Sequence, residues 1–178
     1  DAELKRQREV VADTAELIWS DGTGASADHP YLARKGIEPH GTRVTGDGRL
    51  MAPLFTPDGK IASIQYIDRD GSKLYHTGGQ TGGCFWMVGT TDEPGVIYIA
   101  EGFATAATLH EITHRPCIVA YSASNLVPVT GTIREKYGAT QEIVIVADND
   151  ASGTGQNYAD QASAKYGARV VMPPVDCD

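Results

Sequence analysis

The sequence lacks any apolar run long enough to cross a membrane. No stretch approaches the roughly 18 consecutive apolar residues that a spanning helix needs, and the first ten residues, DAELKRQREV, contain no apolar signal core. We therefore expect a cytoplasmic protein without a membrane partner. The chain begins with Asp rather than Met, so we also expect it to be a piece of a longer protein.

Cysteine is scarce and widely spaced. The three cysteines, Cys84, Cys117 and Cys177, form no C-x-x-C pair. Zinc ribbons and dithiol redox sites need such pairs. The sequence therefore predicts isolated thiols and no zinc in this fragment.

Basic residues are also few, with 15 Lys and Arg against 23 Asp and Glu, for a formal net charge of -8. Nonspecific nucleic-acid affinity comes mainly from Lys and Arg contacts to phosphate, so the overall charge argues against a nucleic-acid partner. A local basic patch could offset this. Its candidate members are Arg34, Lys35, Arg43, Arg69 and Lys73.

The first half of the chain predicts an α+β region. Apolar residues at helical spacing predict a helix over 3–19, which the Gly- and Ser-rich segment 21–26 ends. A short helix is expected to close at Gly36. From residue 49 to 88, alternating segments predict a small antiparallel sheet. Its expected strands are RLMAPLFT, KIASIQYID, SKLYH and CFWMVG, with turns at Pro57-Asp58-Gly59 and at Asp70-Gly71.

After residue 94, buried strands alternate with helices. The expected strands are VIYIA, CIVAYS, EIVIVA and ARVVMP, and the expected helices are FATAATLHEI and segments near 131–137 and 156–165. This alternation predicts βαβ units and a parallel, Rossmann-like sheet with flanking helices. The domains expected are an N-terminal helix and linker (1–28), a small α+β subdomain (29–92) and the parallel domain (93–178).

Three acids follow the ends of predicted parallel strands: Glu101, Asp148 and Asp150. Ligands of open parallel sheets bind at that edge. Asp148 and Asp150 are two residues apart in expected extended backbone, so their side chains should point the same way. Converging carboxylates repel one another without a cation, which predicts bound Mg²⁺ or Mn²⁺. Two ions are expected. Gly102, Gly153 and Gly155 flank these acids and should allow tight turns and close approach of backbone to phosphate.

A structural interpretation of each acid stays open. Asp148 could begin a turn, Asp150 could cap the next helix and Glu101 could be an ordinary strand-end residue. The combination of acid-Gly after one buried strand and D-x-D-x-x-G after another favours metal chemistry.

Other patterns in the sequence fit less well. The segment HEITH (110–114) fits the H-E-x-x-H zinc pattern, but Pro116 must end its helix at about His114 and no third His follows. An EF-hand loop starting at Asp148 would have Ala159 instead of its last Glu. A phosphatase beginning with D-x-D would need more than the residues that remain. Aromatic residues of the small sheet could stack bases, although a core role is more usual.

The segments IAEGFATAATLHE and IVIVADNDASGTGQ resemble the two signatures of the Toprim domain, which occurs in bacterial primases, type IA and II topoisomerases and some nucleases. Within that superfamily, YSASNL and ADNDASG are most similar to primases of phages and conjugative plasmids. The segment APLFTPDGKIASIQYIDRDGSKLYHTGG resembles the smaller subdomain that precedes Toprim in primases. The resemblance covers roughly residues 29–173.

The resemblance implies roles for individual residues. Glu101 resembles the Toprim glutamate that assists proton transfer or metal binding, and Asp148 and Asp150 resemble the metal-ligating pair. Lys73 resembles a primase lysine that contacts nucleotide or template, and Arg69 could help it neutralise phosphate. The chain departs from chromosomal primases, because CFWMVG lacks a second lysine and a zinc ribbon and a C-terminal helical subdomain are absent.

Two further polar residues, Ser122 and Asn125, follow another predicted strand. They could hydrogen-bond a nucleotide or position a carboxylate. The function implied is a DNA primase catalytic core, a metal-dependent nucleotidyltransferase that makes primers on a single-stranded DNA template from nucleoside triphosphates, with a replicative helicase as partner in cis or in trans. The alternatives are a Toprim nuclease and a non-catalytic nucleic-acid-binding or helicase-docking module.

Overall fold

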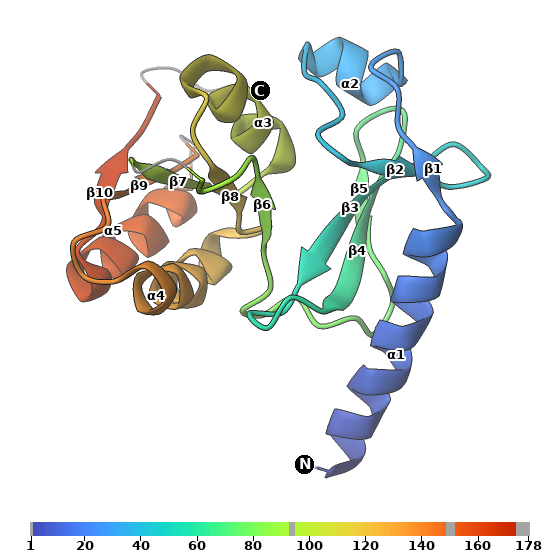
Figure 1. The fold of residues 1–178 in the computed structure, drawn as a ribbon, viewed down its shortest axis with the longest axis horizontal. Coiled ribbons are helices and arrows are strands. Elements are labelled where there is room, and N and C mark those ends of the chain that lie inside the picture. Colours follow the sequence, from blue (N-terminus) through green and yellow to red (C-terminus); the bar gives the residue numbers. More distant parts are fainter. Residues whose placement is uncertain (1, 93–94, 149–151, 174–178) are drawn as a thin grey trace. The chain divides into compact units, whose positions relative to one another are not determined.

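The computed structural model describes residues 2–92, 95–148 and 152–173. The chain divides into two compact units, residues 1–84 and 85–178, each built around its own sheet (Figure 1). The described residues contain no helix with the length and apolarity of a membrane span.

The N-terminal unit packs a long helix against an antiparallel sheet. The helix α1 (Ala2–Asp21) contributes Ala15 to a buried cluster with Met51, Ile64 and Tyr66 of the sheet. In spatial order the strands are β1 (Thr23–Gly24), β2 (Arg43–Val44), β3 (Leu50–Phe55), β4 (Ile61–Ile67) and β5 (Lys73–Tyr75). Lys73 therefore begins an edge strand.

Local signals in this unit agree with the predictions. The short helix α2 (Pro30–Lys35) has Pro at its first position and ends at Gly36, whose left-handed backbone (φ 65°) is easiest for glycine. At its N-terminus, His29 Nδ1 accepts a hydrogen bond from the Tyr31 N–H (3.3 Å). The strands β1 and β2 were not predicted, because two-residue strands are too short to show an alternating pattern.

The C-terminal unit is the expected parallel sheet with helices on both faces. Its strand order is β10-β9-β7-β8-β6, with β6 (Trp86–Val88) antiparallel at one edge. The four parallel strands are β7 (Ile97–Ala100), β8 (Cys117–Val119), β9 (Ile143–Val146) and β10 (Arg169–Val171). The Rossmann-like fold class predicted from the alternating strands and helices is confirmed.

The connecting helices place a switch point between β7 and β9. Helix α3 (Phe103–Thr113) covers one face of the sheet, and α4 (Leu126–Tyr137) and α5 (Thr154–Tyr166) cover the other (Figure 1). Connections thus leave the neighbouring strands β7 and β9 toward opposite faces. A crevice for ligands is expected beyond the carboxyl ends of two such strands.

Two sequence-based assignments were wrong in detail. CFWMVG was expected in the first sheet, but β6 pairs with β8 of the second, and Trp86 stacks on Phe103 of α3 with ring centroids 5.4 Å apart. Helix α4 begins at Leu126 instead of near 131, after a 3₁₀ turn over Ala123–Asn125. Its first turn can include Pro128, because the backbone at that end of a helix needs no N–H donor.

Candidate metal and nucleotide site

Glu101 lies at the end of β7, immediately before Gly102, the N-cap of α3. Its Oε1 atom is buried. Its backbone carbonyl accepts a hydrogen bond from the Tyr121 N–H at 2.8 Å, so the ends of β7 and β8 are joined at this residue. A negative side chain beside a helix N-terminus is electrostatically favourable. The predicted position of Glu101 at a parallel strand end is confirmed.

Asp148 follows β9, the strand directly beside β7, and its side chain is exposed. The parallel register pairs Ala100 with Val146, so the two acids leave adjacent strands at the same edge. The next helix, α5, starts after Gly153, which adopts a left-handed conformation (φ 65°) that favours glycine. The structure therefore brings Glu101 and Asp148 to the switch point of the sheet.

The third predicted acid, Asp150, lies outside the described residues. Within the described ranges, no three His, Cys, Asp or Glu side chains form a group that could hold a metal. Glu101 and Asp148 nevertheless supply carboxylate oxygens at one edge, and oxygen is the ligand type that Mg²⁺ and Mn²⁺ take in proteins. The donors that the structure describes fit such an ion.

Tyr121 is a residue of this site that sequence reasoning missed. It is buried, and its φ of 72° lies in the left-handed region that bulky residues rarely adopt. Such strain persists only where surrounding contacts hold the residue in place, and strained residues cluster at functional sites. The hydrogen bond from its N–H to the Glu101 carbonyl is one such constraint. A sequence gives no signal for a left-handed tyrosine.

Ser122 and Asn125 follow Tyr121 at the same strand end, and they differ in exposure. Ser122 is exposed and lies 3.4 Å from Ser124, hydroxyl to hydroxyl. Asn125 is buried, and its Nδ2 donates to the Ala120 carbonyl at 2.7 Å. Of the two predicted polar residues, Ser122 is the one whose side chain is open to a ligand.

The predicted basic residues Lys73 and Arg69 belong to the N-terminal unit and are exposed. Lys73 and Tyr75 lie on one face of β5, since side chains two apart in a strand point the same way. Arg69 packs its guanidinium against Gly48, where even a methyl group would come within 2.7 Å of it. Its carbonyl also accepts from Arg34 Nη1 at 2.8 Å.

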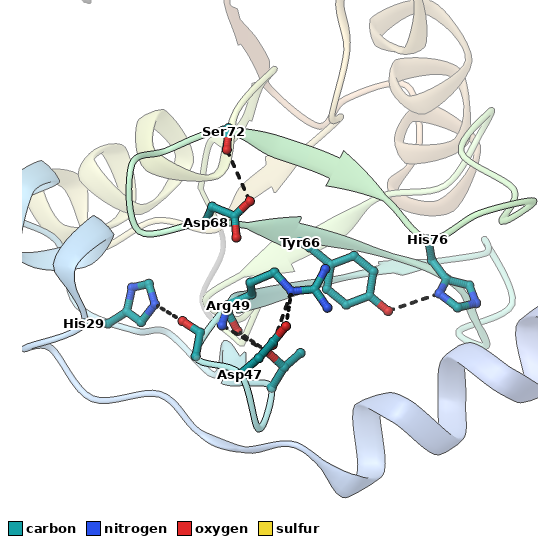
Figure 2. Close-up of polar contacts among 9 residues, drawn as sticks. His29, Asp47, Arg49, Tyr66, Asp68, Ser72 and His76 are labelled. Carbon is teal, nitrogen blue, oxygen red and sulfur yellow. Dashed lines mark hydrogen bonds and ion pairs between the residues drawn. The ribbon is translucent and has the colours of Figure 1, made fainter.

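A polar network surrounds the turn between β2 and β3 (Figure 2). Arg49 pairs with Asp47 at 3.1 Å and lies over the Tyr66 ring, 4.6 Å from its centroid. Tyr66 in turn contacts His76, hydroxyl to Nδ1, at 3.1 Å. Hydrogen bonds from Thr45 and Arg49 hold the pKa of Asp47 below its usual range. Arg49 is thus a fixed cation that the sequence did not single out.

Arg43, by contrast, is committed to the fold. Its Nη1 donates to the Trp19, Ser20 and Gly22 carbonyls at 2.9 to 3.2 Å, and its guanidinium lies 5.1 Å from the Trp19 ring centroid. The carbonyls at the end of α1 have no partners within the helix, so Arg43 satisfies them. Arg43 was predicted to belong to a basic patch, but its guanidinium binds backbone carbonyls at the end of α1.

The HEITH segment has the geometry expected of a helix end. Helix α3 stops at Thr113, and His114 caps it in a left-handed conformation (φ 55°). His110 Nδ1 donates to the Arg115 carbonyl at 2.8 Å. His114 therefore lies one turn after His110 but outside the helix, in a left-handed conformation, whereas the zinc pattern requires both histidines on one helix.

Comparisons with known proteins agree with this geometry. Residues 96–178 match the Toprim domain family. The chain is 29% identical to DNA primase TraC of Escherichia coli over 184 residues, which cover 96% of this chain and 17% of that protein. A second Escherichia coli TraC protein is also 29% identical and is covered over 13% of its length. The chain thus spans less than a fifth of these relatives.

Solved structures show the same fold over both units. The primase fragment of the bacteriophage T7 primase-helicase protein has a TM-score of 0.64 at 18% identity, covering 88% of this chain and 68% of that one. The DnaG primase catalytic domain bound to ssDNA has a TM-score of 0.61 at 11% identity, covering all of this chain and 76% of that one. At these identities the likeness concerns the fold.

Proposed function

We propose that this chain, whose residues 96–178 match the Toprim domain family, is the catalytic core of a DNA primase. One observation carries the proposal: Glu101 and Asp148 meet at the switch point of the Toprim sheet, in a chain whose fold over both units is that of primase cores. The reaction proposed is template-directed nucleotidyl transfer. A single-stranded DNA template and nucleoside triphosphates are the substrates.

The acids have the ligand chemistry that this reaction needs. Asp148 and Asp150 would hold divalent ions, with Glu101 as a further ligand or as the acceptor of the 3′-hydroxyl proton. When bound, Mg²⁺ or Mn²⁺ neutralises charge on the triphosphate and on the departing pyrophosphate. The buried Oε1 of Glu101 has restricted access to water, which strengthens its electrostatic interactions. Repulsion between the acids favours metal binding.

The N-terminal unit would supply the cations. Lys73 and Arg69 are exposed and would contact phosphates of nucleotide or template, and Tyr75, on the same face as Lys73, offers a ring for stacking on a base. Ser122 would hydrogen-bond the nucleotide from the Toprim domain. The domain boundary predicted after residue 92 lies later than the division after residue 84, because β6 pairs with β8 of the second sheet.

In a longer parent protein, other parts would bring the template to this core. The T7 structure is a primase fragment of a primase-helicase protein, and the DnaG structure is a primase catalytic domain bound to ssDNA. By analogy, we propose that a replicative helicase, in cis or in trans, brings the template, and that the protein acts in the cytoplasm.

The test is primer synthesis by the intact parent protein on single-stranded templates, with ribonucleotides and with deoxyribonucleotides. Glu101→Gln, Asp148→Asn and Asp150→Asn should each reduce synthesis by about 10²-fold or more, the scale of a lost catalytic group. Asp160→Asn is the control, since it makes the same change at an exposed position of α5.

Two results would redirect the proposal. An Asp148→Asn/Asp150→Asn double variant that still makes primers near the wild-type rate would indicate a binding module. Template cleavage without added nucleotides, lost in the same variants, would indicate a Toprim nuclease.

A further inference from the structure

Gly155, the second residue of α5, is buried against the candidate acids. A Cβ atom at this position would lie 2.4 Å from Glu101 Oε1. It would also lie 3.2 Å from the backbone oxygen and 3.5 Å from the backbone nitrogen of Asp148. The first turn of α5 therefore rests on the Glu101 carboxylate and on the end of β9 at once.

The backbone of Gly155 does not require glycine. The left-handed glycines of this segment include Gly153 (φ 65°) but not Gly155, which lies within the helix. Glycine in a helix lowers its stability relative to alanine. The close approach to Glu101 and Asp148 is the feature that a side chain at position 155 would disturb.

The contacts differ in how readily they would move. The Glu101 carboxylate is the end of a flexible side chain, whereas the Asp148 oxygen belongs to the backbone at a strand end. A methyl group at position 155 would therefore displace the carboxylate while the fold adjusts by a few tenths of an ångström. Since Oε1 is buried, the displaced carboxylate must leave its present position against the first turn of α5.

We propose that Gly155 is a positioning residue, whose missing side chain reserves the space that the Glu101 carboxylate occupies between the first turn of α5 and the end of β7. The inference rests on the proposed function, because it concerns the same acids. It assigns to Gly155 a contact with a catalytic carboxylate, where the sequence suggested only tight turns and close approach of backbone to phosphate.

The first test uses Gly155→Ala in the full chain, with Gln156→Ala, the next and exposed position of α5, as the control. The metal-free melting temperature of Gly155→Ala should change little, because the helix preference of alanine opposes the cost of displacing the carboxylate. Its affinity for Mn²⁺, followed as the Mn²⁺-induced rise in melting temperature, should fall about tenfold or more. Gln156→Ala should keep the wild-type Mn²⁺ response.

A role confined to folding would give the opposite pattern. Gly155→Ala would then lower the metal-free melting temperature and keep the wild-type affinity for Mn²⁺. That result would overturn the inference.

The second test is a double-mutant cycle with Glu101→Asp, which shortens the carboxylate side chain and should make room for the methyl group that Gly155→Ala introduces. Gly155→Ala should raise the metal-free melting temperature by about 2 °C more in the Glu101→Asp background than in the wild type. Additive effects would overturn the inference. This arm needs no metal, so a wild-type protein without an Mn²⁺ response would count against the metal assignment alone.

Discussion

The two units divide the charge of the chain unequally. Residues 1–84 carry ten Lys and Arg against twelve Asp and Glu, whereas residues 85–178 carry five bases against eleven acids. The more acidic unit holds the strand ends where Glu101 and Asp148 meet. The other unit presents Lys73, Arg69 and Arg49 on and around an antiparallel sheet. The N-terminal unit is therefore nearly neutral, although the whole chain has a net charge of -8.

The comparison also shows that some basic residues of each unit stabilise the fold. Among the described residues, each unit contains an arginine whose guanidinium binds backbone carbonyls at a helix end, Arg43 at α1 and Arg134 at α4. Counting basic residues overestimates the binding surface, because such arginines are already satisfied. Four measurements can test which residues of each unit stabilise the fold and which bind ligands.

The largest effect is expected at Arg134. Its guanidinium donates to five carbonyls at 2.6 to 3.2 Å, those of Gly138, Ala139, Gln141, Tyr166 and Gly167. Arg134→Ala should lower the free energy of unfolding by about 3 kcal/mol, because several carbonyls lose their charged donor. Urea unfolding measures it, with Glu135→Ala, exposed on the same helix, as the control. An equal loss in both variants would contradict the structural role.

A smaller loss is expected at Arg43, which has three acceptors and partly exposed contacts. Arg43→Ala should cost about 1.5 kcal/mol and speed hydrogen exchange at the end of α1, while exchange in the C-terminal unit stays unchanged. Lys35→Ala, exposed at the end of α2, should leave both quantities as they are. If exchange rises throughout the chain, the two units do not respond independently.

Lys73 should behave as a ligand-binding cation. Lys73→Ala should weaken binding of single-stranded DNA or nucleotide by about tenfold at low salt and reduce the salt dependence by about one phosphate contact. The melting temperature should change little, because the side chain is exposed. Lys60→Ala, at another exposed lysine of the same unit, is the control. Equal affinities for wild type and Lys73→Ala would leave Lys73 as a solvated edge residue.

The smallest effect concerns a buried thiol in each unit. Burial raises the pKa of Cys84 to about 11 and also raises the pKa of Cys117. A folded-state pKa above the unfolded one stabilises the protein below the unfolded pKa, which is about 8.5 for a thiol. That contribution should be lost as pH rises from the unfolded pKa to about 11. Unfolding followed across this range should show a decline that Cys84→Ala reduces, and a flat profile would contradict it.

Much of the fold follows from local pattern. The buried runs at β7 and β9, the helix at 103–113 and the glycine after α2 are each specified by neighbouring residues, through apolar burial or left-handed backbone. The same local patterns placed Glu101 and Asp148 after parallel strands. The sheet to which β6 belongs escaped prediction because its partner, β8, is distant in sequence, and pairing of that kind leaves no local signal.

The sequence by itself determined which strands end in an acid, where the connecting helices lie and which segments resemble the Toprim signatures. These features depend on residue type and spacing within short segments. Only the tertiary structure decided that Arg43 is occupied by helix-end carbonyls, that Tyr121 is held in a left-handed conformation and that Gly155 lies on the Glu101 carboxylate. These features depend on which distant backbone atoms come within a few ångströms of one another. Such distances follow from packing, which is a property of the whole unit.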